Sequence, residues 1–222
     1  MTPEQLTGQT DSHLTTVTIG DKTFQVHRSI AQDLLNLKQA ANQAGFELCI
    51  ASGFRSFAQQ AAIWDAKMAG NRPILDSNSC EITSDTLTEK QRIQAILRWS
   101  ALPGASRHHW GTDIDLYDAS AIPLGTSLKL EPWEYFTGHQ HAFYTWLAAN
   151  LATFGFYFPY RLEQGGVGIE PWHISHKEQS KACLSALSLD VLQQQLQLHP
   201  VKGINCVLSS LESIYTQYIT NV

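Results

Sequence analysis

The sequence predicts an α+β fold in which helices flank a small, mostly antiparallel sheet. Apolar residues recur at helical spacing in several segments, shorter segments between them alternate apolar and polar residues, and short turns join several of these segments. Strands interspersed with helices in this way are typical of the class. With 222 residues the chain can bury one sizeable core. We therefore expect a single domain over residues 1–222, with its sequence motifs at about 46–176 and C-terminal helices at 180–221.

The charge and hydropathy of the chain exclude several classes of protein. Lys+Arg 15 against Asp+Glu 20 give a net charge of -5, and no segment is rich in Lys or Arg, which argues against a nucleic acid or an anionic membrane as partner. No stretch approaches the ~18 apolar residues of a membrane span, and the first residues lack the pattern of a signal peptide. The four cysteines are far apart and form no CxxC pair. We therefore expect a cytoplasmic protein with reduced thiols, and its oligomeric state stays open.

The first half of the chain combines helices with one short strand. Helical spacing predicts helices over 29–44 and 57–68, and alternation predicts a strand over 46–50 between them. Arg55 then lies at a strand-to-helix turn. A polar segment over 70–85 is long enough to act as a lid over a site.

Periodicity in the second half predicts helices over 88–99 and 140–154, strands over 111–117 and 165–175, and two terminal helices from residue 180 onward. Because strand side chains alternate, Asp113 and Asp115 share one face of the strand over 111–117. Two carboxylates on one strand face are unusual and indicate a site.

Two clusters of histidine and acid carry the chemistry of this sequence. Residues 106–115 read SRHHWGTDID, with a glycine turn between the histidines and the acids, and residues 170–176 read EPWHISH. A catalytic zinc needs three N or O ligands from the protein, an open fourth position, and a nearby carboxylate that acts as base. The residues that supply this set are His108, Asp115, His173 and Glu170.

Neighbouring residues are weaker candidates for these roles. His109 and His176 adjoin the clusters, but in an extended backbone an immediate neighbour points to the opposite face. Asp113 shares the face of Asp115, so periodicity alone does not choose between them.

The spacing of the second cluster raises a conflict. Glu170 and His173 are three residues apart and would face opposite sides of a regular strand. We expect Pro171 to interrupt the strand and to let Glu170 turn inward.

These motifs resemble those of the VanY-type D-alanyl-D-alanine carboxypeptidases in the peptidase M15 group. The match comprises Ser52-Gly53-Phe54-Arg55-Ser56-x-x-x-Gln60, Ser106-x-His108-x-x-Gly111-x-x-x-Asp115 and Glu170-x-Trp172-His173. Three motifs in this order, spread over about 46–175, make the resemblance specific. Phe54 departs from the tyrosine of the family's upstream Ser-Gly-Tyr-Arg-Ser segment.

The resemblance implies a zinc peptidase and assigns roles to single residues. His108, Asp115 and His173 would bind Zn²⁺, Glu170 would activate the attacking water, and Arg55 would stabilise the developing oxyanion. The physical basis is general, since zinc polarises a carbonyl and a positioned carboxylate transfers the proton to the leaving amine.

The resemblance also implies residues near the substrate. Ser106 and Gln60 would lie at the substrate and hold its terminal carboxylate. Asp113 stands where many members of the family carry a small residue; we place it with the substrate-binding residues, where it can also orient His108 or an arginine.

The implied substrate is a muropeptide or another peptidoglycan stem peptide with a terminal D-Ala. The motifs do not distinguish L,D from D,D cleavage. For a cytoplasmic enzyme we favour an L,D-carboxypeptidase that trims tetrapeptides to tripeptides in wall recycling, because trimming pentapeptide precursors would starve wall synthesis. The alternatives are a D,D-carboxypeptidase or dipeptidase, a phage-type endopeptidase and a non-catalytic zinc-binding domain.

Overall fold

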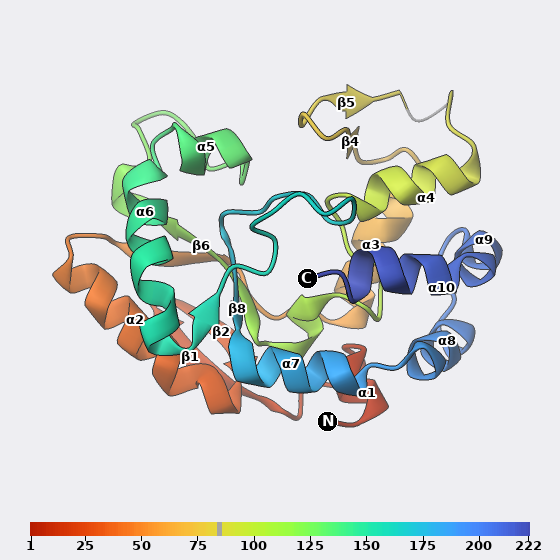
Figure 1. Ribbon diagram of the computed structural model, residues 1–222, viewed down its shortest axis with the longest axis horizontal. Helices are drawn as coiled ribbons and strands as arrows, with labels where there is room; N and C mark the ends of the chain where they lie inside the picture. Colours follow the sequence, from red (N-terminus) through yellow and green to blue (C-terminus); the bar gives the residue numbers. More distant parts are fainter. Residues whose placement is uncertain (84–85) are drawn as a thin grey trace.

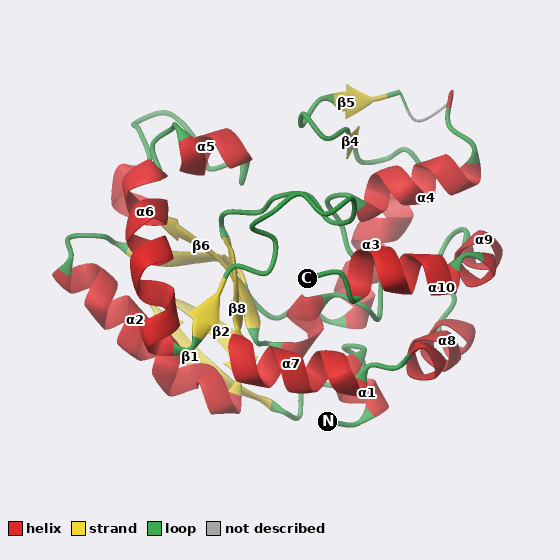
Figure 2. Cartoon of the chain, in the orientation of Figure 1, coloured by secondary structure: helices red, strands yellow, loops and turns green. Residues whose placement is uncertain are grey.

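The computed structural model describes residues 1–83 and 86–222, and it confirms the α+β class. The main sheet and the helices α2 and α6 form one side of the molecule, and α3, α4 and α8–α10 form the other (Figure 1). The strands gather on the first side, apart from the small pair β4 and β5 (Figure 2).

The strands are β1 (Leu14–Ile19), β2 (Lys22–His27), β3 (Leu48–Ser52), β4 (Ile74–Leu75), β5 (Glu81–Ile82), β6 (Asp113–Asp118), β7 (Phe156–Tyr157) and β8 (His173–His176). The α-helices are α1 (Pro3–Leu6), α2 (Ala31–Gln43), α3 (Phe57–Met68), α4 (Glu89–Leu97), α5 (Pro132–Phe136), α6 (His141–Asn150), α7 (Lys177–Ala186), α8 (Leu189–Leu198), α9 (Ile204–Ser209) and α10 (Leu211–Ile214). Short 3-10 turns cover Arg28–Ile30, Arg107–Trp110, Ala119–Ala121 and Leu151–Phe154, and a π-helical turn follows α10 at Tyr215–Ile219.

The main sheet has four antiparallel strands in the order β3-β6-β8-β7. Strand β6 is central, and all of its residues except Tyr117 are buried. Its register pairs Asp115 with Ser52 of β3 and with His173 of β8. The pairing therefore brings together segments that are far apart in the sequence.

Each side of the molecule has its own hydrophobic cluster. Ile114 and Leu116 of β6 pack in one cluster with Leu34 and Leu37 of α2 and with Phe143 of α6. Because side chains alternate along β6, its two aspartates point to the opposite face.

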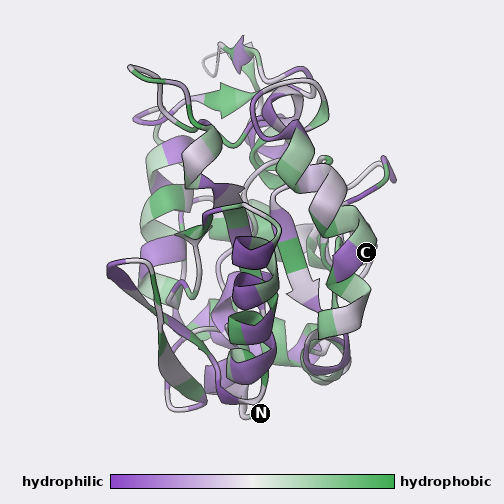
Figure 3. Cartoon of the chain, turned by 90° about the vertical axis from the view of Figure 1, so that its left-hand side faces the viewer, coloured by the Kyte–Doolittle hydropathy of each residue, from purple (hydrophilic) through white to green (hydrophobic). Residues whose placement is uncertain are grey.

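The second cluster joins the helical side to the turn before β6. Trp110 packs there with Trp64 of α3, Ile96 of α4, Leu192 of α8 and Leu211 of α10. Each helix combines apolar and polar residues, as Figure 3 shows by hydropathy, which suits helices that turn one face to a core. The C-terminal helices thus complete a core, as their apolar spacing predicts.

Several predicted elements are confirmed with small shifts of their ends. The helix predicted over 57–68 matches α3, and the one over 140–154 is α6 continued by a 3-10 turn. The strand predicted over 46–50 is β3, which begins at Leu48. Helix α2 begins at Ala31, after a 3-10 turn.

One expectation about strands was wrong, and one hairpin was not expected. The strand predicted over 165–175 exists only from His173, because two glycines begin the segment and Pro171 has no backbone N–H for a sheet ladder. The hairpin of β1 and β2 was missed, although both segments are rich in β-branched residues and meet at a glycine turn.

The segment predicted as a lid, over 70–85, carries the short hairpin of β4 and β5, while residues 84 and 85 lie outside the described part. Its action as a lid stays a prediction, and so does the assignment of residues 1–222 to a single domain. Within the described ranges, no helix is long and apolar enough to cross a membrane.

Gly111 should be intolerant of a side chain. It has φ +67°, and a Cβ atom there would lie 2.7 Å from the backbone nitrogen of His27 and 2.5 Å from a side-chain carbon of Leu14. We expect Gly111→Ala to lower the free energy of unfolding by about 2–4 kcal/mol, through backbone strain and overpacking. Urea unfolding measures this, with Gly20→Ala as control.

Gly20 has φ +61° but open space around its Cβ position. Its substitution should therefore carry only the strain of the left-handed backbone, about 1–2 kcal/mol. An equal loss of unfolding free energy in Gly111→Ala and Gly20→Ala would contradict the close packing at Gly111.

Candidate active site

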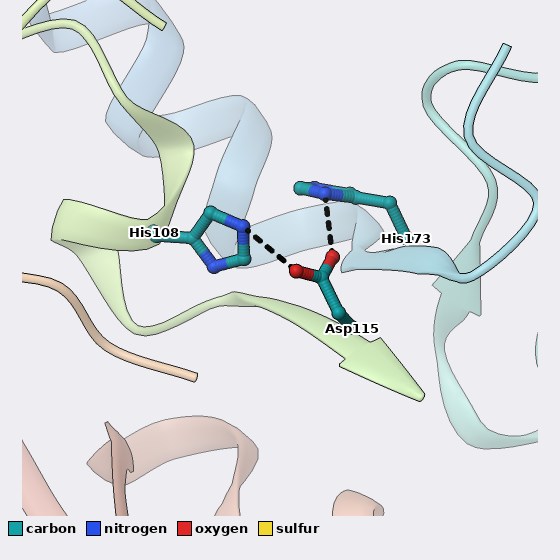
Figure 4. A group of neighbouring side chains, drawn as sticks. All are labelled: His108, Asp115 and His173. Atoms are coloured by element: carbon teal, nitrogen blue, oxygen red, sulfur yellow. Dashed lines mark ion pairs between the residues drawn. The ribbon is translucent and has the colours of Figure 1, made fainter. Parts of the chain in front are cut away.

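Three side chains predicted as metal ligands converge on one point (Figure 4). His108 comes from the 3-10 turn before β6, Asp115 from β6 and His173 from the start of β8. The Nε2 atom of His108 lies 3.5 Å from Oδ2 of Asp115, and Nδ1 of His173 lies 3.1 Å from Oδ1. One ligand atom from each residue lies within 4.8 Å of the other two, so the group can hold a metal ion.

Local structure explains why these residues meet. Gly111 adopts a left-handed conformation, which reverses the chain between His108 and β6. The antiparallel register then sets Asp115 directly beside His173, and side chains of directly paired residues share a face of the sheet.

Hydrogen bonds orient both imidazoles toward the centre. Nδ1 of His108 lies 3.0 Å from the carbonyl oxygen of Gly53, and Nε2 of His173 lies 3.0 Å from Oδ1 of Asp113. Each of these nitrogens is assigned the N–H, because its partner is an acceptor, so the other nitrogen of each ring turns a lone pair inward.

The carboxylate of Asp115 completes a donor set that fits zinc. Its Oδ1 is buried without a hydrogen-bond partner and faces the lone pair of His173 Nδ1. Without a metal, a proton on Nδ1 can bridge the two atoms: burial alone would lower the pKa of His173, but hydrogen bonds to Asp113, Asp115 and Glu170 raise it. A metal ion can take the place of that proton. Two imidazole nitrogens and one carboxylate oxygen are ligands of catalytic zinc sites.

Asp113 lies behind His173 and not on the wall of a substrate cavity. Its carboxylate accepts hydrogen bonds from Nε of Arg107 at 2.7 Å and from Thr112 Oγ1 at 2.7 Å, besides that from His173. Burial opposes ionisation, but the charges and hydrogen bonds of Arg107 and His173 outweigh it and hold the pKa of Asp113 below its usual range. The expectation that Asp113 contacts substrate is corrected: it orients His173, not His108, and it pairs with Arg107.

Glu170 turns inward beside the triad, as the interruption by Pro171 predicts. The backbone N–H of His173 donates to the carbonyl of Glu170 at 3.1 Å, which closes a turn before β8. The carboxylate Oε2 then lies 3.4 Å from Nδ1 of His173. Burial raises the pKa of Glu170, which brings it closer to the value of an effective general base near neutral pH.

Arg55 is held in place by two side chains. Its guanidinium donates to Oε1 of Gln60 at 2.7 Å and to Oγ of Ser52 at 2.9 Å. Gln60 is fully buried, and its amide nitrogen donates to the carbonyl of Ala101 at 2.7 Å. The expectation that Gln60 holds a substrate carboxylate is therefore corrected, because both ends of its amide are engaged within the protein and it positions Arg55 instead.

A cavity of about 480 Å³ opens over this centre. Among the described residues that line it are Arg55, Ser106, His108, Asp115, Tyr160, Glu170 and His173. Ser106 lies on the wall of the cavity, and its contact with a substrate carboxylate stays a prediction. The cavity is large enough for a short peptide.

The two neighbouring histidines take no part in the triad. His109 is fully buried; its Nδ1 lies 2.6 Å from the carbonyl oxygen of Arg55, and burial lowers its pKa to about 3. His176 faces Asp33, with Nε2 at 3.2 Å from Oδ2.

Sequence reasoning missed two groups that shape the site. The ring of Tyr160 lies edge-on to His173 with centroids 5.0 Å apart, and burial raises its pKa to about 12. The carbonyl of Gly53 orients His108. A tyrosine in an irregular loop and a backbone carbonyl give no pattern in the sequence.

The comparison with known families agrees with this geometry. The sequence model of the VanY family, described as D-alanyl-D-alanine carboxypeptidase, matches residues 23–179, more than half of the chain. The chain belongs to the VanY family. It is therefore a metallopeptidase of the D-alanyl-D-alanine carboxypeptidase family, and His108, Asp115 and His173 form its possible metal site.

Two relatives show the range of this similarity. An uncharacterized protein of Haemophilus influenzae is 40% identical over 121 residues, which are 53% of this chain and 92% of that protein. A D-alanyl-D-alanine carboxypeptidase of Enterococcus faecalis is 31% identical over 147 residues, which are 65% of this chain and 45% of that protein.

Solved structures share the fold. VanYB in complex with D-alanine-D-alanine matches with a TM-score of 0.55 at 24% identity, over 86% of this chain and 91% of that one. The LdcB LD-carboxypeptidase matches with a TM-score of 0.54 at 22% identity, over 82% and 78%. A VanY D,D-pentapeptidase variant with bound Zn(II) matches with a TM-score of 0.52 at 24% identity, over 81% and 88%.

Removal of Asp115 should abolish tight zinc binding. We expect Asp115→Ala to bind less than one zinc per chain under conditions that saturate the unchanged protein, because two imidazoles alone leave the site one ligand short. Metal analysis after dialysis measures this. Asp21→Ala, at an exposed turn, is the matched control, and full zinc retention by Asp115→Ala would contradict the ligand assignment.

Removal of the charge of Asp113 should destabilise the fold. Asp113→Asn leaves the Arg107 guanidinium buried without its counter-charge, which costs about 3–5 kcal/mol of unfolding free energy at neutral pH. Because folding lowers the pKa of Asp113, the stability from this charge is present above the ordinary carboxyl pKa and is lost as the pH falls below it. Urea unfolding at neutral and at acid pH measures the difference in unfolding free energy between Asp113→Asn and the unchanged protein. We expect this difference to be smaller at acid pH. An equal difference at both pH values would contradict the charge pairing.

Proposed function

We propose that this chain is an L,D-carboxypeptidase that removes the terminal D-Ala from tetrapeptide stem peptides and leaves tripeptides. The observation that carries the proposal is the size of the cavity beside Glu170 and Arg55, about 480 Å³. In L,D cleavage the residue before the scissile bond is a diamino acid with a long side chain, whereas in D,D cleavage it is alanine. A cavity of this volume accommodates the longer side chain as well as alanine, so the choice of the tetrapeptide follows from the cytoplasmic role proposed below.

We infer that His108, Asp115 and His173 hold the zinc ion. Zinc in this position supplies Lewis acidity, which polarises a carbonyl group and lowers the pKa of water. The remaining chemistry belongs to residues of the chain.

Glu170 is the proton-transfer group in this proposal. Its carboxylate borders the triad and can accept a proton from the attacking water and then donate it to the leaving amine of D-Ala. Burial raises its pKa, which makes the carboxylate a stronger base for the first step.

Arg55 stabilises the negative charge that develops on the carbonyl oxygen of the scissile bond. Gln60 and Ser52 hold its guanidinium before substrate binds, so little reorganisation is needed during the reaction. Ser106, on the cavity wall, is placed to contact the peptide.

The cellular role in the proposal is muropeptide recycling in the cytoplasm. Trimming of tetrapeptides there would not consume the pentapeptide precursors of wall synthesis. Fractionation of cells with an antibody against the protein tests this location.

A D,D-carboxypeptidase is the second candidate. The match to the D-alanyl-D-alanine carboxypeptidase family favours it. The two activities differ in substrate, so one experiment separates them.

The deciding measurement is mass spectrometry of disaccharide tetrapeptide and disaccharide pentapeptide after incubation with zinc-loaded protein. We expect loss of one D-Ala from the tetrapeptide, and no loss after treatment with a chelator. Loss from the pentapeptide with the tetrapeptide intact would replace the proposal with D,D cleavage.

Glu170→Ala should lower the rate of hydrolysis by about 10²–10⁴-fold, because the general base is removed. Zinc content should be unchanged, since Glu170 lies outside the triad. Glu212→Ala, on an exposed face of α10, is the control. Hydrolysis at the control rate by zinc-loaded Glu170→Ala would rule out the assigned role.

A further inference from the structure

Two basic side chains line the active-site cavity on the side of α3 and β4. Lys67 lies in the last turn of α3, and Arg72 lies in the segment between α3 and β4. The wall around them is largely apolar, with Ile63, Pro73 and Leu75. Lys67 is half-buried and Arg72 is exposed.

Neither charge is paired with an acid of the described residues. Among residues 1–83 and 86–222, no carboxylate oxygen lies within 4.0 Å of the cationic nitrogens of Lys67 or Arg72. Buried Arg107, in contrast, is paired with Asp113. A cation at the C-terminal end of a helix is favoured by the carbonyl groups there, so α3 supports the charge of Lys67 without cancelling it.

These two cations also share the wall with Arg55. Burial and the neighbouring charge of Arg72 lower the pKa of Lys67. Burial likewise lowers the pKa of Arg55, and Arg72 adds to this effect. At the end of the cavity near α3 and β4, Arg72 therefore repels Lys67; it also repels Arg55, whose charge Asp115 and Glu170 offset.

The acids of the cavity do not compensate this end. Asp115 and Glu170 surround the metal position. Glu131 comes from the segment before α5, which lies apart from β4 in Figure 1, and accepts a hydrogen bond from Trp133 Nε1 at 2.5 Å. An anion from outside the protein would relieve the repulsion.

We propose that Lys67 and Arg72 form a subsite for a carboxylate of the peptide substrate. The guanidinium of Arg72 can bind a carboxylate with two parallel hydrogen bonds, and the ammonium of Lys67 adds a point charge. This inference rests on the proposed function for the class of substrate. Stem peptides offer two sources of the group, the C-terminal carboxylate and the carboxylates of internal residues.

The test measures peptide binding without turnover, by calorimetry on zinc-loaded Glu170→Ala protein. Three forms of the tetrapeptide serve as probes: unmodified, with the C-terminal carboxylate as an amide, and with the internal carboxylates as amides. Lys67→Met and Arg72→Gln are each added to this background. Lys90→Met is the matched control, because Lys90 is exposed on α4 and does not line the cavity.

We expect Lys67→Met and Arg72→Gln each to weaken binding of the unmodified peptide by about 10-fold, and Lys90→Met by less than about 2-fold. One of the two amidated peptides should bind the background protein weakly, and its affinity should not fall further in Lys67→Met or Arg72→Gln. The carboxylate that this peptide lacks is then the group that the subsite binds. Both variants should unfold at or above the temperature of the background protein, because each removes a repulsive charge.

Equal binding of the unmodified peptide by the background protein and both variants overturns the subsite, even if the unchanged enzyme hydrolyses the peptide. If Lys67→Met and Arg72→Gln weaken binding but the unchanged enzyme does not hydrolyse the peptide, the subsite is supported and the proposed function is overturned. Failure of the background protein to bind any of the peptides overturns both.

Discussion

The antiparallel pairing of β6 with β8 is the constraint on which the site depends. It sets Asp115 beside His173 and brings Glu170, at the turn before β8, to the same place. The apolar residues of β6 secure this pairing from the other face, where they pack against α2 and α6. A shift of the β6–β8 pairing by one residue would turn Asp115 into that apolar core. The three ligands can therefore meet only in the observed register.

Burial sets the electrostatics of the centre. Asp113 and Arg107 are almost without solvent exposure, and each is stabilised in its charged form by the other. This pair fixes the ring of His173 through the hydrogen bond to Asp113. A buried ion pair thus orients His173, one of the proposed metal ligands, although removing its two charges from water is unfavourable.

The cavity holds two groups of charged side chains with different roles. Close to the triad, acids and the held guanidinium of Arg55 face the reacting bond. Further along the wall, Lys67 and Arg72 lie without acidic partners from the described chain. Catalysis by a zinc centre needs only the first arrangement, so the second concerns which peptide is bound.

The sequence by itself determined the class of the fold, most of the longer helices and the three residues that we propose as metal ligands. These follow from local rules: helical spacing identifies α3 and α6, and alternation places both aspartates of β6 on one face. The motifs that resemble the VanY family identified His108, Asp115, His173 and Glu170 as the site.

Only the tertiary structure decided what the flanking polar residues do. Gln60 and Asp113 lie within the family motifs, yet their partners, Ala101 and Arg107, are brought to them by packing between elements, and these contacts turn both side chains away from the cavity. The same holds for Lys67, since nothing in its helix shows that no described acid pairs with it. Spacing along a chain specifies the direction of a side chain on its own element, whereas its hydrogen-bond partners and its burial depend on segments far away in sequence.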